Sequence, residues 1–173
     1  MDLSKITIET ERLRLEPVSY QYREESFREF TPEITKFMFP KSPEKIEEVD
    51  EYLKSAQEKL RMGESFDMVI LKKDTGEFLG RGGIHDINTK TPELGIWIKK
   101  SAHGHGYGLE AVAAFKEWVD ANLDYEYLTY PVDKRNIASR KIPESLGGVV
   151  KREFTQTGMG GQELDEVEYH IYK

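Results

Sequence analysis

The fold is decided by residues 93–118, which read ELGIWIKKSAHGHGYGLEAVAAFKEW. The first residues alternate between apolar and other side chains, and this period of two is typical of a β-strand: Leu94, Ile96, Ile98. Three glycines then follow at intervals of two: Gly104, Gly106, Gly108. Beyond them, apolar residues recur every three or four positions, as on one face of an amphipathic helix: Leu109, Val112, Phe115, Val119. The stretch therefore predicts a strand, a glycine-rich loop and a helix, in that order.

The glycine-rich loop predicts a binding site for an anion. Glycine has no Cβ, so a ligand can approach the backbone closely. The helix adds unpaired N-terminal N–H groups and the positive end of its dipole, an arrangement that most often binds phosphate. The third glycine falls one residue too early for a dinucleotide-binding loop, and no Gly-Lys-Ser/Thr follows as in a P-loop. Spacing alone fits an anion site and a flexible connection equally well.

Further motifs lie in order along nearly the whole chain: TERLRL at 10–15, FLG at 78–80, ELGIWI at 93–98, HGHGYG at 103–108, and Asn136-x-x-Ser139 followed by Leu146-Gly147-Gly148. Together these motifs resemble the GNAT superfamily of N-acetyltransferases. In particular, they resemble its Rim-type branch, the ribosomal-protein N-acetyltransferases and their relatives. His103 stands where the family usually has Gln or Arg.

The resemblance implies one α+β domain over residues 1–173. Its mixed, mostly antiparallel sheet would have about six or seven strands, splayed between the fourth and the fifth, with about four helices around it. Strands are expected at 12–16, 66–71, 78–84, 93–99, 125–132, 149–154 and 167–172. Ser42 is expected to cap a helix that runs from Pro43 to about Arg61. Pro131 agrees with a splayed pair of strands, because its missing N–H costs little there.

Composition limits the classes of function. Cysteine is absent, which excludes disulfides, thiolate metal sites and a cysteine nucleophile, and a reducing cytoplasm is the expected compartment. The net charge of −7 argues against general binding to nucleic acid. We find neither an apolar run long enough to span a membrane nor the apolar core of a signal peptide.

The resemblance also implies the reaction, a direct transfer of acetyl from acetyl-CoA to an amine, which is either a protein N-terminus or a small molecule. Glu93 is the candidate general base and Ser139 the candidate acid toward sulfur. The cofactor would be held by the amides of Ile96, Trp97 and Ile98, by the polar side chain of Asn136, and by the loop residues His103, Gly104, His105, Gly106, Tyr107 and Gly108. Two plainer interpretations stay open: Glu93 as a solvated strand-end residue, and Asn136 with Ser139 as a helix cap.

Other candidates carry two interpretations each. Four cations either meet phosphate or are solvated: Lys99, Lys100, Arg140, Lys141. Four side chains either pack in the core or touch the acceptor: Phe37, Met38, Phe39, Tyr52. No metal is expected, because the spacing of His85, His103 and His105 matches no familiar ligand motif.

Three further questions stay open at this stage. Pro143 implies either a kinked helix after Asn136 or a loop there with a late turn. Homodimers are common in the family, and the glycine tip near Met159 is a candidate contact. The alternative function is a GNAT-like sensor that binds acetyl-CoA without efficient turnover.

Overall fold

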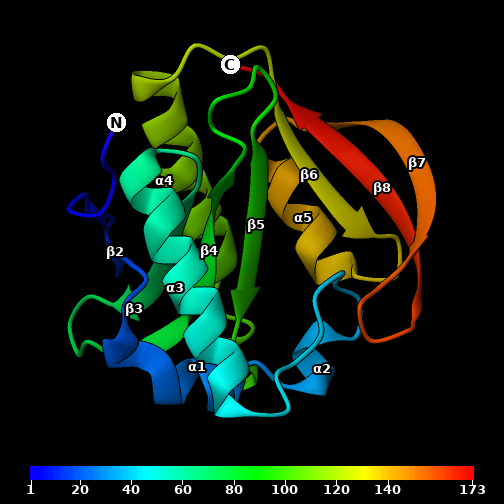
Figure 1. Cartoon of the computed structure of the whole chain (residues 1–173). Coiled ribbons are helices and arrows are strands. Elements are labelled where there is room, and N and C mark those ends of the chain that lie inside the picture. The colour runs from blue at the N-terminus through cyan, green and yellow to red at the C-terminus, as the bar shows by residue number, and fades with distance from the viewer.

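One sheet runs through the protein, for which a computed structural model describes residues 1–173. Its eight strands are arranged in the order β1-β2-β3-β4-β5-β6-β8-β7. The strands are β1 (Ile8–Glu9), β2 (Leu13–Pro17), β3 (Phe66–Lys72), β4 (Phe78–His85), β5 (Glu93–Ile98), β6 (Leu128–Asp133), β7 (Val149–Thr157) and β8 (Glu163–Ile171). All neighbours are antiparallel except β5 and β6, which are parallel and diverge along their length (Figure 1).

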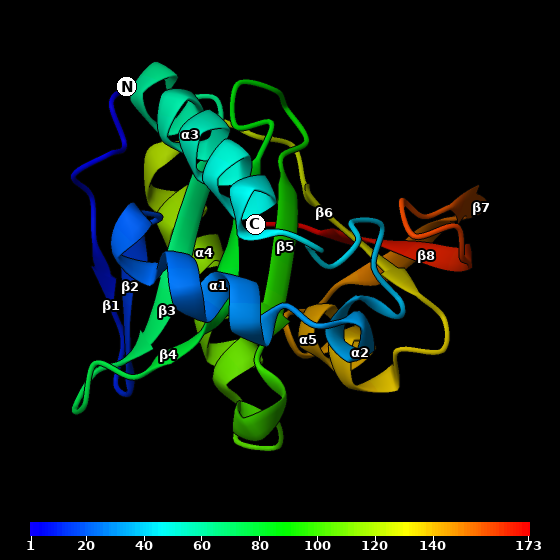
Figure 2. The ribbon, with the colours of Figure 1, turned by 60° about the horizontal axis from the view of Figure 1, so that its bottom comes forward.

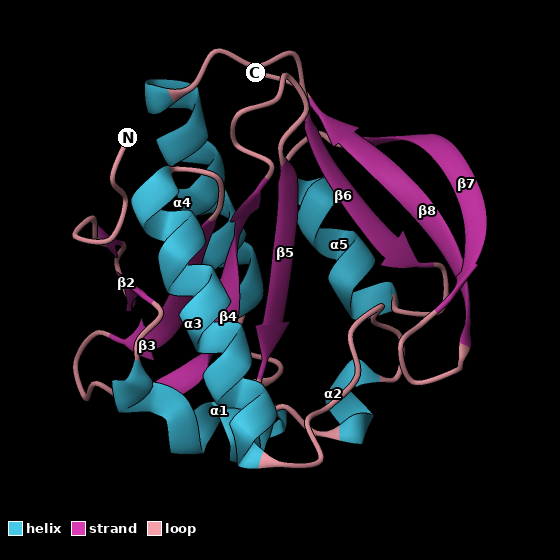
Figure 3. Ribbon diagram, in the orientation of Figure 1, coloured by secondary structure: helices cyan, strands magenta, loops and turns pink.

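Helices cover both faces of the sheet (Figures 2 and 3). They are α1 (Arg23–Glu29), α2 (Pro32–Thr35), α3 (Ile46–Met62), α4 (Tyr107–Asn122) and α5 (Ile137–Ser145), with 3₁₀ turns at Tyr20–Tyr22 and Lys100–Ala102. Helices α1 and α3 lie over one face, and α4 and α5 over the other. None of these helices combines the length and the apolar character that crossing a membrane requires.

The core lies between these layers. In α4 the apolar stripe expected from the sequence is buried against β4 and β5, including Val112, Phe115 and Val119. The glycines of β4 allow its neighbours to approach closely. A Cβ at Gly80 would lie 2.1 Å from the carbonyl oxygen of Trp97 on β5, so no larger residue fits there without moving the backbone.

The parallel pair β5–β6 is joined at one point only, where Glu93 is opposite Thr129. Beside that point, the Thr129 amide donates to the Pro92 carbonyl at 2.9 Å. Past Glu93 the two strands separate, and β6 pairs with β8 on its other side, with Pro131 opposite Glu168. The predicted splay between the fourth and fifth expected strands is therefore confirmed.

Three local predictions differ from the structure. The strands number eight because Ile8–Glu9 forms a short strand of its own, paired with β2. Helix α3 begins at Ile46, and the Ser42 cap is wrong: the Glu48 carboxylate accepts from the amides of Glu44 and Lys45, at 2.6 and 2.9 Å, and so fixes the start of the helix.

Pro143 lies inside α5, within its last turn. The helix continues through it to Ser145, so the alternative of a loop between 136 and 141 is wrong. An interior proline leaves one carbonyl without its helical donor, here the carbonyl of Ser139. Pro143 lies so close to the end of the helix that only three more residues are needed to complete the last turn. The amides of Leu146 and Gly148 both donate to the Pro143 carbonyl, at 3.1 and 2.8 Å.

Candidate functional site

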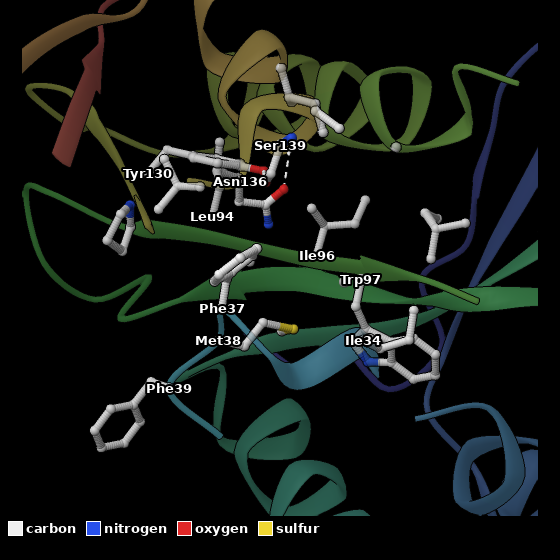
Figure 4. A pocket seen from close by; sticks show the side chains of 18 of the residues that line it. Ile34, Phe37, Met38, Phe39, Leu94, Ile96, Trp97, Tyr130, Asn136 and Ser139 are labelled. Atoms are coloured by element: carbon white, nitrogen blue, oxygen red, sulfur yellow. Dashed lines mark hydrogen bonds between the residues drawn. The ribbon is translucent and has the colours of Figure 1, made fainter. Parts of the chain in front are cut away.

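A cleft of about 1250 Å³ opens where β5 and β6 separate. That volume exceeds the roughly 300–1,000 Å³ of most single-ligand pockets, so the cleft has room for two ligands side by side. Figure 4 shows its two sides: Leu94 and Ile96 point toward Asn136, Ser139 and Tyr130, whereas Met38 and Trp97 lie on the opposite side of β5.

The edge of β5 that faces the cleft carries backbone groups without a partner strand. The Lys99 amide donates to the Leu79 carbonyl of β4 at 2.7 Å. Because backbone direction alternates along an antiparallel pair, Trp97 and Gly95 also point their amides toward β4. The amides of Leu94, Ile96 and Ile98 then point away from β4. That of Leu94 takes part in the single pairing with Thr129 of β6, so the amides of Ile96 and Ile98 are the ones that point unused into the cleft.

This alternation corrects one of the three amides expected from the sequence. Ile96 and Ile98 face the cleft through their backbone, as expected. Trp97 does not, and its indole stacks on Phe30 with ring centroids 4.6 Å apart on the α1 face of the sheet.

The glycine-rich loop after β5 presents a row of unused N–H groups. No amide from Gly104 through Leu109 donates to any protein acceptor, and the first helical bond of α4 runs from Glu110 to Gly106. Gly104 and Gly106 have φ of +82° and +75°, a region that favours glycine. Successive amides in such a turn, continued by a helix N-terminus, form a concave anion site. His105 is exposed and, unlike its neighbours Gly104 and Gly106, is not among the residues that line the cleft.

A segment far away in the sequence holds this loop in place. The Glu110 carboxylate accepts from the Thr10 hydroxyl at 2.6 Å and from the Arg12 amide at 2.8 Å, and pairs with the Arg12 guanidinium at 2.6 Å. Arg12 also donates to the His105 carbonyl at 2.9 Å. These bonds, after the opposing effect of burial, lower the pKa of Glu110. Thr10 and Arg12, in the first half of the TERLRL motif, thus clamp the loop. The sequence alone did not indicate this role.

Glu93 lies at the point where the strands separate and lines the cleft. Its carboxylate forms no hydrogen bond or ion pair within the protein. Burial raises its pKa above the ordinary value of a glutamate, and the nearby carboxylates of Asp86, Glu168 and Glu166 act in the same direction, with only His85 opposing. A partly buried, unpaired carboxylate with a raised pKa takes up a proton more readily than an ordinary glutamate does.

A hydrogen-bonded chain lies beside Glu93. His85, opposite Glu93 in the sheet, has Nδ1 3.0 Å from the Ser65 hydroxyl. That hydroxyl donates to Asp67 at 2.6 Å, and Asp67 also accepts from the Tyr52 hydroxyl at 3.0 Å. The chain fixes the His85 ring at the wall of the cleft. It was not predicted, because its members come from three elements that only the fold brings together.

Ser139 and Asn136 lie on the other side of the cleft, at the start of α5. The Ser139 hydroxyl is 2.8 Å from the Tyr130 hydroxyl of β6, and burial raises the pKa of Tyr130 to about 12. Asn136 accepts from the Ser139 amide at 3.3 Å, so it is the helix cap that the plainer interpretation described. Both side chains nevertheless line the cleft (Figure 4), and capping leaves the Asn136 amide group free.

Most of the basic candidates for phosphate point elsewhere. Lys99 pairs with Glu77 and Lys100 with Glu33, each at 2.8 Å, and Arg140 donates to the Tyr169 hydroxyl at 3.0 Å. Lys141 alone among the four lines the cleft without an ion pair. The ring of His103 also turns inward, with Nε2 2.6 Å from the Ile98 carbonyl.

One end of the cleft is lined by two loops that touch. All four uncertain residues of the 37–52 region line the cleft: Phe37, Met38, Phe39, Tyr52. The tip between β7 and β8 packs against them, since the Met159 amide donates to the Phe39 carbonyl and Gln162 donates to the Met38 carbonyl, both at 2.8 Å. The part of this tip in a homodimer stays a prediction. No three His, Cys, Asp or Glu side chains gather as they would around a metal ion.

Comparison with known proteins places these features in a family. Residues 12–149 match the sequence profile of the Acetyltransferase (GNAT) domain. No curated protein sequence matches the chain significantly.

Solved structures agree with that family assignment. The chain is similar to a GCN5-related N-acetyltransferase from Brucella melitensis, with a TM-score of 0.82 at 19% identity over 99% of this chain and 80% of the other. It is also similar to a ribosomal-protein-S5-alanine acetyltransferase from Vibrio fischeri, with a TM-score of 0.81 at 16% identity over 97% of each chain. At these identities the likeness is one of fold.

The clamp on the loop generates a first prediction. Arg12→Ala removes the bonds to Glu110 and to the His105 carbonyl, so the loop amides lose part of their preorganisation. We expect the Kd for acetyl-CoA, the ligand that the resemblance implies, to rise about three- to tenfold, in line with the ~1 kcal/mol of a typical hydrogen bond. Calorimetric titration measures it. Arg28→Ala, an exposed arginine beside Glu29, is the matched control, and an unchanged Kd in Arg12→Ala would show that the loop needs no clamp.

Proposed function

The chain belongs to the acetyltransferase (GNAT) domain family, and from that premise we propose that it transfers an acetyl group from acetyl-CoA directly to a primary amine. The acceptor is a protein N-terminus or a small amine. Two likenesses support membership of the Rim-type branch: the ordered motifs, and the fold shared with a ribosomal-protein acetyltransferase. Residues 1–173 act as one domain in this proposal, since one sheet and one core run through them. We place the protein in the cytoplasm because it has no cysteine.

The observation that carries the proposal is a pair of groups of unused backbone donors along the cleft. One group lies on the open edge of β5, and the other is made of the loop amides from Gly104 to Leu109. This surface fits acetyl-CoA: a diphosphate needs several convergent N–H groups, and an extended amide-bearing arm needs an open strand edge. In the proposal, the loop residues and Ile96 and Ile98 hold the ligand, with the Asn136 side chain as a further polar partner.

Acetyl-CoA, when bound, supplies an acetyl group activated as a thioester. The protein then has three tasks: to stabilise negative charge on the acetyl oxygen, to accept the proton of the amine, and to protonate the departing sulfur. The amide of Ile96 is the first unused donor beyond the point where the strands part, and it serves the first task. The absence of cysteine fits direct attack without an acyl-enzyme formed on a thiol.

Glu93 serves the second task, directly or through a water molecule. An ammonium ion is not a nucleophile, and a carboxylate beside it both binds it and removes its proton. Its neighbours Glu166 and Glu168 also line the cleft and favour a cation there. We assign the binding of the amine to these three glutamates, rather than to the overall negative charge of the chain.

Ser139 serves the third task together with Tyr130. The buried Tyr130 hydroxyl keeps its proton at neutral pH, because its pKa is raised to about 12. Its hydrogen bond to the Ser139 hydroxyl gives a short chain from a buried donor to the cleft. In this assignment Ser139 contacts the sulfur and Tyr130 supports it.

The proposal is tested by binding and turnover measured on the same protein. Acetyl-CoA should raise the melting temperature, because a ligand that binds only the native state stabilises it. A panel of small amines and of peptides with free N-termini is then assayed for release of free CoA. We expect release with at least one class of amine. A melting-temperature shift without any release would instead support the sensor, and no shift would exclude both functions.

Glu93→Gln generates a prediction about pH. A base works only when deprotonated, so kcat/KM should rise with pH through the raised pKa of Glu93 and level off above it. The variant should lose this acidic limb and about 10²- to 10⁴-fold in rate. Because folding raises this pKa, the ionised glutamate lowers stability above it, so Glu93→Gln should also melt higher at pH 8. Glu126→Gln, at an exposed glutamate, is the control, and an unchanged pH profile in Glu93→Gln would refute the base.

The paired hydroxyls generate a further prediction. Ser139→Ala should lower kcat more than it weakens binding of acetyl-CoA, because its contact with sulfur matters when charge develops there. Tyr130→Phe should lower kcat by a smaller factor, and the double variant should be no slower than Ser139→Ala, since the two hydroxyls act in series. Strictly multiplicative losses would show that they act separately, and an unchanged kcat in Ser139→Ala would remove it from the mechanism.

A further inference from the structure

Arg81 is a buried cation without a partner. It lies in the middle of β4 and is only 8% exposed. Its Nε and Nη1 atoms are buried and have no hydrogen-bond acceptor, and the guanidinium forms no ion pair with any carboxylate of the chain. Burial of an unpaired charge is unfavourable, so the fold keeps a costly group at this place. None of the steps above uses it.

The surroundings of Arg81 hold the guanidinium in position without satisfying it. Its central carbon lies 4.1 Å from the ring centroid of Tyr52, 5.4 Å from that of Trp97 and 5.6 Å from that of Phe30. Ring faces attract a cation, but they do not replace the in-plane acceptors that its N–H groups require. The nearest acidic residue on the neighbouring strand, Asp67, is already bonded to Ser65 and Tyr52.

Arg81 belongs to the acceptor side of the cleft. It lines the cleft and is opposite Trp97 in the sheet. Along the same two strands, the Gly83–Gly95 pair lies two residues away from Arg81 and the His85–Glu93 pair lies four residues away. Cross-strand partners share a face, so Arg81, Gly95 and Glu93 all face the side covered by α1 and α3. Trp97 is the next-to-last residue of β5, so along the strand Arg81 lies near the end from which the glycine-rich loop continues, but on the face covered by α1 and α3.

We propose that Arg81 binds a carboxylate group of the acceptor, so that the substrate is a small amine that also carries a carboxylate, of the amino-acid type. This inference rests on the proposed function and narrows its acceptor. The planar guanidinium matches a carboxylate with two parallel N–H···O bonds, and the aromatic rings around it exclude water from that pair.

The charges nearby select a carboxylate over a phosphate. Glu93, Glu166 and Glu168 line the same cleft as Arg81, and together they repel a dianion more strongly than a monoanion. The same carboxylates attract the ammonium group of the acceptor. A zwitterion with one positive and one negative group therefore fits both features, whereas a protein N-terminus followed by a peptide bond offers Arg81 no charge.

The test compares acids with their amides. Alpha-, beta- and omega-amino acids with apolar bodies are assayed for CoA release beside the matching primary amides, which differ only in the carboxylate. We expect each acid that is acetylated to have a kcat/KM about 100-fold above that of its amide in the native chain, because losing one partner leaves Arg81 unpaired. In Arg81→Met this ratio should fall to about one, and in Arg81→Lys it should be intermediate.

Two controls keep this result separate from the proposed function. Arg81→Met should keep the native melting temperature or exceed it, and should keep the thermal shift with acetyl-CoA, since the loop amides are untouched. Binding is also measured by calorimetry without turnover, with 3-phenylpropanoate and 3-phenylpropanamide. The acid should bind at least tenfold more tightly to the native chain and lose that advantage in Arg81→Met.

The outcomes separate cleanly. Carboxylate binding that depends on Arg81, without any CoA release, supports the Arg81 site and contradicts the proposed transfer. Amides or peptide N-termini acetylated as well as the acids overturn the Arg81 site and leave the transferase standing. The Arg81 site is equally overturned if an acid preference survives in Arg81→Met, or if the native chain neither binds 3-phenylpropanoate nor acetylates any acid.

Discussion

The single pairing between β5 and β6 is the constraint on which the rest of the structure depends. One parallel pair, Glu93 with Thr129, joins two halves of an eight-stranded sheet. Strands that part after one pair leave buried edges with unused donors and acceptors, which a protein normally avoids. Here the unused edge of β5 becomes the floor of a large cleft. Glu93 stands at the apex of the divergence, so the residue that joins the two halves is also the one best placed to meet a reacting group.

The loop that continues this edge is organised from outside itself. A glycine-rich turn with two positive-φ positions has many accessible conformations, and ordering it costs entropy. Thr10 and Arg12, about a hundred residues earlier, hold Glu110 and the His105 carbonyl, and so stabilise the conformation in which the amides converge. The turn between β1 and β2 and the glycine-rich loop thus act as one unit. This explains why the TERLRL motif, far from the loop in the sequence, is one of the motifs that resemble the family.

Sequence reasoning predicted what depends on local period and on ordered motifs. The strand–loop–helix unit followed from alternation and from glycine spacing, whereas the splay was implied by the resemblance to the family, with which Pro131 agrees. Sequence reasoning failed where particular side-chain contacts decide. Glu48, rather than Ser42, fixes the start of α3, because the Glu48 side chain reaches two backbone amides ahead of it. The partners of Lys99 and Lys100 come from other elements, and no one-dimensional pattern places them. The sequence left a kinked helix and a loop both open at Pro143; the residue falls in the last turn, where little of the helix remains to be disrupted.

The two ends of the cleft suit ligand groups of opposite charge: backbone N–H groups suit an anion at the loop end, and carboxylates suit a cation at the acceptor end. At the loop end, Lys99 and Lys100 are paired with glutamates and only Lys141 lines the cleft unpaired, so an anion would be held there mainly by backbone N–H groups and a helix dipole. Such fixed dipoles add no net positive charge to a chain of net charge −7. The acceptor end can therefore remain acidic and attract an ammonium group without competition from mobile lysines. Arg81 is the exception among these carboxylates. In the site proposed above, its buried guanidinium would make the enzyme prefer, over other amines, one that carries a negative group at a defined distance from the amine. Selectivity in this cleft would then come from the position of one cation rather than from the overall charge of the surface.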